Sequence, residues 1–143
     1  KAFEIFDSNG IPRDRIILAT FTQEALRDAQ KRYPDVRRVH HIHYKQQDDG
    51  TFLLNGKVKC EDFDAVAAKM AEWKKEMGLI GYNLPTSSPN TTVEFVRKLK
   101  SEGCWLSLWY IHTLELAHKF KDSGVDGYVT GMPSAVRNAL KEN

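Results

Sequence analysis

The 143-residue sequence is poor in cysteine, in net charge and in long apolar runs, and each shortage excludes a class of protein. The two cysteines, Cys60 and Cys104, lie far apart without metal-ligand spacing, so we expect reduced thiols rather than a disulfide framework or a metal knuckle. That usage favours a cytoplasmic location over a secreted one, and the residues present carry no targeting signal. A net charge of +2 gives no electrostatic case for binding nucleic acid or a membrane surface. No apolar run approaches the roughly 20 residues that a transmembrane helix needs.

What the sequence does contain is a regular alternation of strand-like and helix-like segments with glycine at the junctions. Short apolar runs predict strands over residues 15–21, 36–44, 79–85, 104–111 and 125–130. Apolar residues at helical spacing predict helices that begin near residues 22, 63, 91, 113 and 133. This α/β pattern of parallel βα repeats is typical of a doubly wound sheet or of a TIM-like (β/α) barrel. Neither a dinucleotide fingerprint nor a P-loop is present, which favours the barrel without deciding between the two folds.

Turn and cap signals locate the ends of several elements. Residues 45–60 interrupt the βα rhythm, and within them Asn55-Gly56 is the pair most typical of a tight β-hairpin turn. We therefore predict a hairpin insertion that hangs over one end of the fold. Thr91 and Glu94 have the spacing of a capping box, which predicts Thr91 as the residue that caps the next helix.

The stretch from Trp109 to Pro133 carries a resemblance to a known family. A hydrophobic strand ends at Trp109, and the segment Gly-Val-Asp-Gly-Tyr-Val-Thr-Gly-Met-Pro follows one helix later at 124–133. These features resemble the closing portion of glycerophosphodiester phosphodiesterases, relatives of the phosphatidylinositol-phospholipase-C-like barrels. Residues 14–26, with Thr20-Phe21 in place of Ser-Phe, and residues 81–85 are similar to two further strand ends of that family.

The resemblance implies that residues 1–143 are one partial domain, the C-terminal portion of a metal-dependent phosphodiesterase barrel with a hairpin insertion at 45–60. The complete enzyme hydrolyses a glycerophosphodiester to glycerol phosphate and an alcohol with Ca²⁺ or Mg²⁺, a reaction of lipid metabolism. The family carries its chemistry on His-Arg-Gly, Glu-x-Asp and His-Asp elements, and this sequence contains none of them. We therefore expect a segment that binds no metal by itself and is inactive when isolated. Its partner would be the missing N-terminal half or a second copy that covers the open sheet edges.

The same resemblance implies a set of substrate-binding residues, although no catalytic or metal-ligating residue is assigned. The set consists of the residues at the strand ends, namely Trp109, Thr130, Phe21, Asn83 and His112. The sequence departs from the family at Tyr110 and His112, where Thr and Asn are usual, and at Gly131, where Asp is usual. Trp105 shares the strand face of Trp109 and competes with it as the aromatic wall of a pocket.

Two alternatives come from the residues themselves. His41 and His43 are two positions apart on a predicted strand, so they could share a zinc ion with His112 or Asp48 in an unrelated barrel enzyme. We favour the simpler interpretation that His41 and His43 lie at a strand end, where they are half-solvated or form a hydrogen bond with a loop, and the sequence assigns no role to His40. The second alternative is a non-catalytic partial barrel that serves as an assembly or interaction module, because a partial parallel sheet leaves two open edges.

Overall fold

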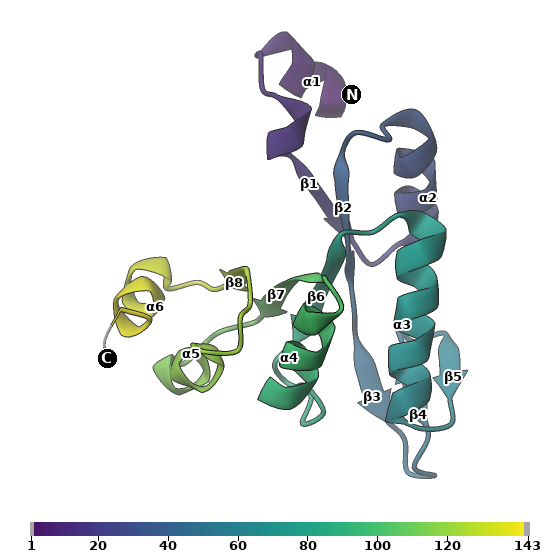
Figure 1. Cartoon of the computed structure of the whole chain (residues 1–143), viewed down its shortest axis with the longest axis vertical. Coiled ribbons are helices and arrows are strands. Elements are labelled where there is room, and N and C mark those ends of the chain that lie inside the picture. Colours follow the sequence, from purple (N-terminus) through teal and green to yellow (C-terminus); the bar gives the residue numbers. More distant parts are fainter. Residues whose placement is uncertain (1, 142–143) are drawn as a thin grey trace.

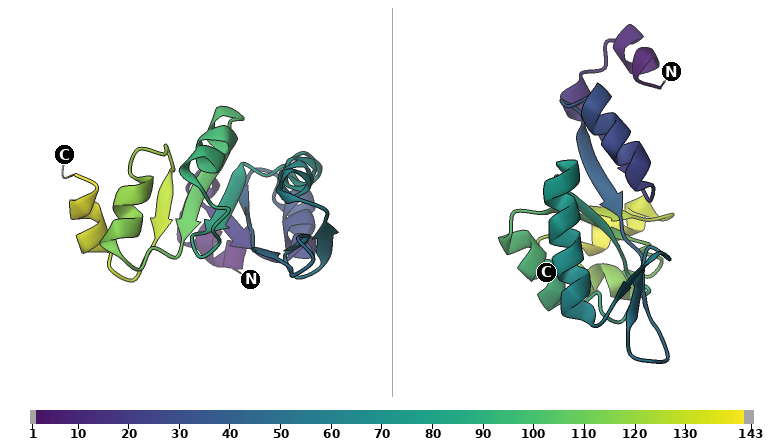
Figure 2. Two further views of the ribbon diagram at one scale, coloured as in Figure 1. Left: turned by 90° about the horizontal axis from the view of Figure 1, so that it is seen from below. Right: turned by 90° about the vertical axis from the view of Figure 1, so that its right-hand side faces the viewer.

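The computed structural model describes residues 2–141 of the chain. Its larger sheet is parallel, and its five strands are β1 (Ile17–Thr20), β2 (Arg37–His41), β6 (Gly81–Pro85), β7 (Trp105–Trp109) and β8 (Gly127–Val129), in that spatial order. The connecting helices are α2 (Gln23–Arg32), α3 (Phe63–Met77), α4 (Val93–Ser101) and α5 (Leu114–Phe120), and α6 (Pro133–Ala139) follows β8. The sheet curls into a half-barrel of βα units, with the helices along its outer side (Figures 1 and 2). This confirms the predicted α/β class and the barrel rather than the doubly wound sheet.

Alternate residues of each strand face the helices or the hollow of the half-barrel. The helix-facing side chains of β6 and β7 form the centre of the core, where Tyr82, Leu84, Leu106 and Leu108 are almost completely buried. The opposite face carries Gly81, Asn83, Trp105, Ser107 and Trp109 and has no helix over it among residues 2–141. This uncovered face is called the concave face below.

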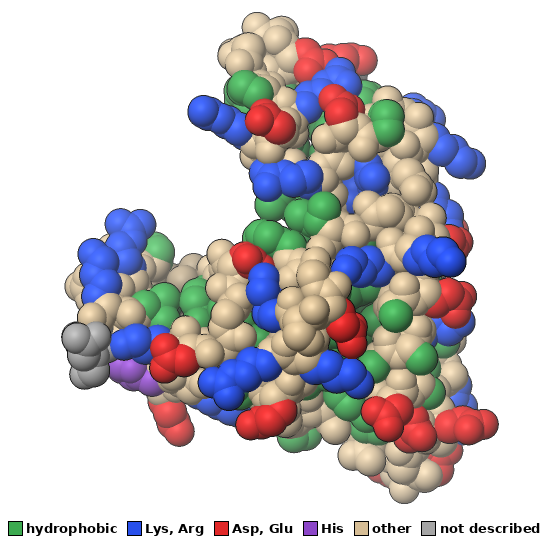
Figure 3. All heavy atoms as spheres, in the orientation of Figure 1, with side chains coloured by type: hydrophobic (Ala, Val, Ile, Leu, Met, Phe, Trp, Pro, Cys, Tyr) green, Lys and Arg blue, Asp and Glu red, His purple; other side chains and the backbone are tan. Residues whose placement is uncertain are grey.

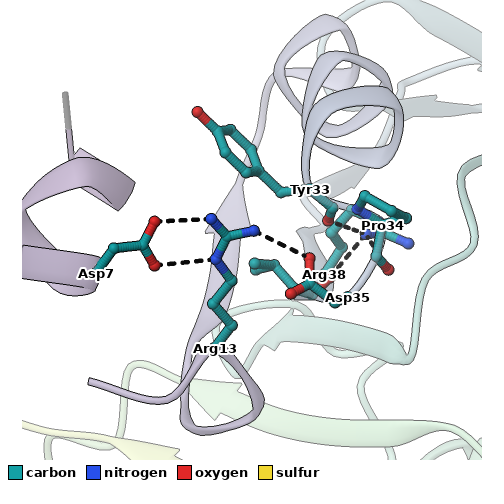
Figure 4. A network of polar contacts seen from close by, with 7 residues as sticks. Asp7, Arg13, Tyr33, Pro34, Asp35 and Arg38 are labelled. Carbon is teal, nitrogen blue, oxygen red and sulfur yellow. Dashed lines mark hydrogen bonds and ion pairs between the residues drawn. The ribbon is translucent and has the colours of Figure 1, made fainter. Parts of the chain in front are cut away.

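A short arm precedes the half-barrel and projects from one end of it (Figure 1). It consists of α1 (Ala2–Ser8) and a 3₁₀ turn at Arg13–Arg15, and neither is predicted from the sequence pattern. Arg13 anchors the arm through two hydrogen bonds to the carboxylate of Asp7, at 3.0 and 2.7 Å, and an ion pair to Asp35 at 3.5 Å (Figure 4).

The predicted hairpin at 45–60 is present and larger than expected. β4 (Phe52–Leu54) and β5 (Val58–Cys60) pair antiparallel around Asn55-Gly56, whose φ angles of 48° and 68° fit the tight turn. A third strand, β3 (Tyr44–Gln46), pairs with β4, so the insertion is a three-stranded sheet. The prediction of one strand over 36–44 is therefore wrong. Ile42 still donates to the backbone oxygen of Asn83, but from His43 onward the chain pairs with the insertion.

The predicted capping box is wrong by one residue. Thr92 caps α4 by accepting from the Phe95 amide at 3.1 Å, whereas Thr91 is buried and donates its hydroxyl to the Pro85 carbonyl. The Thr91 hydroxyl also bonds the phenol of Tyr44, so it attaches the insertion to the half-barrel. Among residues 2–141, no helix is long and apolar enough to cross a membrane.

Asn55 holds the turn of the insertion against the end of β2. Its Oδ1 accepts from the His43 amide at 2.7 Å, and its Nδ2 donates to the His41 carbonyl at 3.2 Å. Its Nδ2 also lies 3.1 Å from Nε2 of His40. We expect Asn55→Gly, which tolerates the positive φ but removes these three contacts, to lower the free energy of unfolding by about 1–2 kcal/mol. Urea denaturation measures this change. Lys57→Ala in the same exposed turn is the control, and an equal effect of the two substitutions would contradict the assigned role of Asn55.

Candidate functional site

Four side chains meet at the carboxyl ends of the parallel strands. Phe21 follows β1, His41 ends β2, Asn83 lies in β6, and Trp109 ends β7. The strand register places His41 directly beside Asn83. These four residues are called the strand-end cluster below, and they lie where (β/α) barrels build their active sites.

Contacts within the strand-end cluster link all four members. The Phe21 ring stacks on His41 with centroids 4.8 Å apart and meets Trp109 edge to face at 5.6 Å. The Trp109 indole donates to the backbone oxygen of Asn83 at 3.2 Å, and the Asn83 side-chain amide lies 2.8 Å from Nδ1 of His41. Two aromatic walls and two polar side chains therefore converge on one spot, which suits a small ligand with both apolar and hydrogen-bonding parts.

A trough of about 320 Å³ runs along the concave face below the strand-end cluster. His41, Asn83 and Ser107 lie side by side across it in the strand register, with Gly127 at the end of the row. Trp105 also lines the trough and lies four residues, or two repeats of the pleat, before Trp109. Trp105 and Trp109 thus do not compete for one place, because each occupies a different level of the same face.

Burial affects the two histidines of β2. It lowers the pKa of His41, which is half-buried, and it is the main cause of the lowered pKa of His40, which is fully buried on the helix side of the strand. Both rings therefore resist protonation more than an exposed histidine does. His40 packs against the Trp73 ring with centroids 5.2 Å apart and belongs to the core rather than to the concave face.

The remaining predicted site residues lie apart from the strand-end cluster. His112 is exposed, and its Nδ1 contacts the carbonyl of Tyr110 at 3.1 Å within its own loop. The Thr130 hydroxyl accepts from the Met132 amide at 3.1 Å, which is local turn chemistry before α6. Of the five predicted substrate-binding residues, the structure brings Phe21, Asn83 and Trp109 together. The structure also adds His41 to this group. The sequence signal that could have identified His41 as a member is its position at the carboxyl end of a predicted strand.

The described residues do not fit a metal centre. His43 lies beyond the end of β2 and is exposed, so it does not share a strand face with His41 as the zinc alternative requires. No group of three or more His, Cys, Asp or Glu side chains within residues 2–141 is placed to hold a metal ion. Cys60 and Cys104 are buried free thiols, and burial raises the pKa of both.

Comparison of the structure with solved proteins identifies the fold. A phosphodiesterase from Oleispira antarctica, solved in complex with the product sn-glycerol-3-phosphate, matches 99% of this chain with a TM-score of 0.71 and 17% identity. A glycerophosphodiester phosphodiesterase from Parabacteroides distasonis matches 97% of the chain with a TM-score of 0.68 and 16% identity. The chain has the fold of part of these phosphodiesterase barrels. It spans about half of their length, since the match covers 48% of each.

By sequence alone, no family model and no curated protein matches the chain. The likeness to the phosphodiesterase barrels therefore lies in the backbone and in the short strand-end motifs. It agrees with the resemblance seen at Trp109–Pro133.

Proposed function

We propose that this chain is part of a glycerophosphodiester phosphodiesterase, which hydrolyses its substrate to glycerol phosphate and an alcohol. The observation that supports the proposal is the strand-end cluster, which occupies the carboxyl edge of a sheet with the fold of phosphodiesterase barrels. Phe21 and Trp109 would form apolar walls against the carbon chain of the glycerol unit. Asn83 and its neighbours would supply hydrogen bonds at the polar end.

The chain would form part of the substrate pocket without carrying the hydrolytic step. The His-Arg-Gly, Glu-x-Asp and His-Asp elements are absent from the sequence, and the described residues do not fit a metal ion. The Ca²⁺ or Mg²⁺ that the reaction is expected to use would have to be held by residues outside this chain.

The concave face and the two sheet edges suggest the partner of the chain. β1 and β8 are the outer strands of the sheet, and each has an unpaired edge within the described residues. Figure 3 shows hydrophobic side chains gathered in the hollow between the arm and the lower part of the molecule. Further βα units that complete the barrel would cover this hollow, because the similar barrels are about twice as long as the chain.

Titration of the ¹⁵N-labelled chain with sn-glycerol 3-phosphate tests the binding part of the proposal. We expect NMR shifts confined to the strand-end cluster, and binding about three- to tenfold weaker in Phe21→Ala because an apolar wall is lost. Leu114→Ala is the matched control, since Leu114 is 43% exposed and Phe21 48%. Shifts scattered over the surface, or none, would argue against a glycerol phosphate site.

The catalytic part has a separate test. We expect the purified chain to leave a glycerophosphodiester intact in the presence of Mg²⁺ or Ca²⁺, since it lacks the family's catalytic elements. Release of glycerol phosphate by the chain alone would contradict this division of roles. A discrete dimer in light scattering would instead favour the non-catalytic assembly module.

A further inference from the structure

We propose that His41 is a ligand-binding residue that donates its Nε2–H to a phosphoryl oxygen of the substrate. The inference rests on the proposed function, because the phosphoryl group is the ligand which that function supplies. His41 stands outside the motifs that carry the family resemblance. Its role is inferred from how the neighbouring side chains hold the ring.

The ring of His41 is fixed in two ways. Phe21 stacks against it with centroids 4.8 Å apart and an interplanar angle of 26°. Asn83, on the neighbouring strand, places its side-chain nitrogen 2.8 Å from Nδ1. A ring held by one stacked aromatic face and one hydrogen bond has little freedom to rotate, so its second nitrogen keeps a defined direction.

The orientation of the Asn83 amide determines which nitrogen of His41 carries the proton. Asn83 is 4% exposed, and its Oδ1 has no hydrogen-bond partner, while its Nδ2 lies against Nδ1 of His41. In this orientation one N–H of the amide donates to Nδ1, while the second N–H and Oδ1 have no partner among residues 2–141. Turning the amide round would pair the oxygen but leave both N–H donors unpaired, which costs more because an orphaned buried N–H is less tolerable than an under-satisfied oxygen. Asn83 therefore donates to Nδ1, and His41 is the tautomer that carries its proton on Nε2.

That Nε2–H is available to a ligand. Within residues 2–141, the buried side-chain nitrogen and oxygen atoms that lack a partner are Nδ1 of His40 and Oδ1 of Asn83, and Nε2 of His41 is not among them. Nε2 also makes no hydrogen bond to the residues that the structure describes, so it is accessible to solvent, and His41 lines the trough. The lowered pKa of His41 keeps the free ring neutral near pH 7, when Nε2 is a donor.

A phosphoryl group suits this donor better than a hydroxyl group does. An anionic oxygen forms a shorter and stronger hydrogen bond with an N–H than a neutral oxygen does. A nearby phosphate also favours the protonated ring, so binding must raise the pKa of His41. A glycerol hydroxyl at the same place would leave that pKa almost unchanged. The unpaired Oδ1 of Asn83 is an acceptor nearby and would suit a hydroxyl of the same ligand.

The test uses the whole chain labelled with ¹⁵N in its histidine rings. In the free protein we expect Nδ1 of His41 unprotonated and Nε2 protonated above the pKa. Addition of sn-glycerol 3-phosphate should raise the pKa of His41, and His41→Leu should weaken binding about tenfold or more. His41→Gln keeps an N–H donor and should recover part of the affinity. His118→Gln, on the exposed side of α5, is the control and should bind as the wild type does.

The outcomes separate this inference from the proposed function. If the wild type binds glycerol phosphate and His41→Leu binds equally well, the role of His41 is wrong while the proposed function stands. A proton on Nδ1 of the free protein would likewise contradict the inference alone. If the wild type shows no binding in the same titration, the proposed function fails for this chain, and the role of His41 fails with it.

Discussion

Replacing Gly81 by alanine is expected to lower the free energy of unfolding by about 3 kcal/mol or more, enough to prevent stable folding. Gly81 opens β6, the central strand, and pairs with Val39 on one side and Trp105 on the other. A Cβ at this position would overlap the carbonyl oxygen of Trp105 and lie 2.6 Å from its carbonyl carbon. These are backbone atoms of a paired strand, so they cannot turn away as a side chain would. The sheet would have to separate between β6 and β7.

Gly127→Ala is the matched control, because Gly127 also lies on the concave face and opens β8, the strand on the other side of β7. A Cβ there would lie 3.6 Å from the nearest atom, the Cβ of Ser107, which is an ordinary contact. Its expected effect is within about 0.5 kcal/mol. Urea denaturation followed by circular dichroism measures both variants. Similar stabilities for Gly81→Ala and Gly127→Ala would contradict the close approach of β6 and β7.

The βα alternation could be predicted from the sequence because its signals are local. Apolar runs, helical spacing and glycine at the junctions each depend on neighbouring residues, and they locate the five strands of the sheet. The packing that makes Gly81 indispensable depends instead on the register between β6 and β7. Residues 81–85 indicate a strand end by resemblance, but they do not show how closely Trp105 approaches.

Two local predictions are wrong because a distant segment decides the structure. Ile42 and Tyr44 are both buried, so the apolar pattern continues past His41 although the hydrogen-bonding partner changes there. Thr91 has the spacing of a cap, yet its hydroxyl is taken by Tyr44, which is 47 residues away. Neither of these long-range contacts can be predicted from the residues that flank it in the sequence.

The residues of the candidate site likewise fall into two groups, those predictable from local motifs and those that depend on the tertiary structure. The strand-end motifs point to Phe21, Asn83 and Trp109, which the structure brings together. The inclusion of His41 depends on the pairing of β2 with β6, and the isolation of His112 depends on the path of its loop. Membership of the strand-end cluster is therefore a property of strand register rather than of residue type.

Removing the guanidinium of Arg38 is the second substitution with a large expected effect. Arg38 is 7% exposed and donates to five backbone carbonyls, those of Tyr33, Pro34, Val36, Met77 and Gly78. Figure 4 shows its bonds to the first turn after α2. The Met77 and Gly78 carbonyls are at the end of α3, so one side chain satisfies the carboxyl ends of two helices, where a cation also matches the helix dipoles.

We expect Arg38→Met to lower the free energy of unfolding by about 3 kcal/mol or more, because a methionine fills the space but removes five hydrogen bonds to buried and part-buried carbonyls. Burial lowers the pKa of Arg38, yet a guanidinium remains charged at any pH where the protein folds, so the effect should not depend on pH between 5 and 9. Arg37→Met is the control, since Arg37 is the exposed neighbour on β2 and should change stability by less than about 0.5 kcal/mol.

Hydrogen exchange distinguishes the role of Arg38 from a general loss of core packing. If Arg38 joins the two helix ends, the amides of the last turns of α2 and α3 should exchange faster in Arg38→Met than those of α4 and α5, measured under conditions where the variant is still folded. Uniform acceleration over all helices would mean that the guanidinium acts only through global stability. Protection in α2 and α3 equal to that of the wild type would show that other groups satisfy these carbonyls, and the five hydrogen bonds would then not explain why an arginine is buried beneath two helix ends.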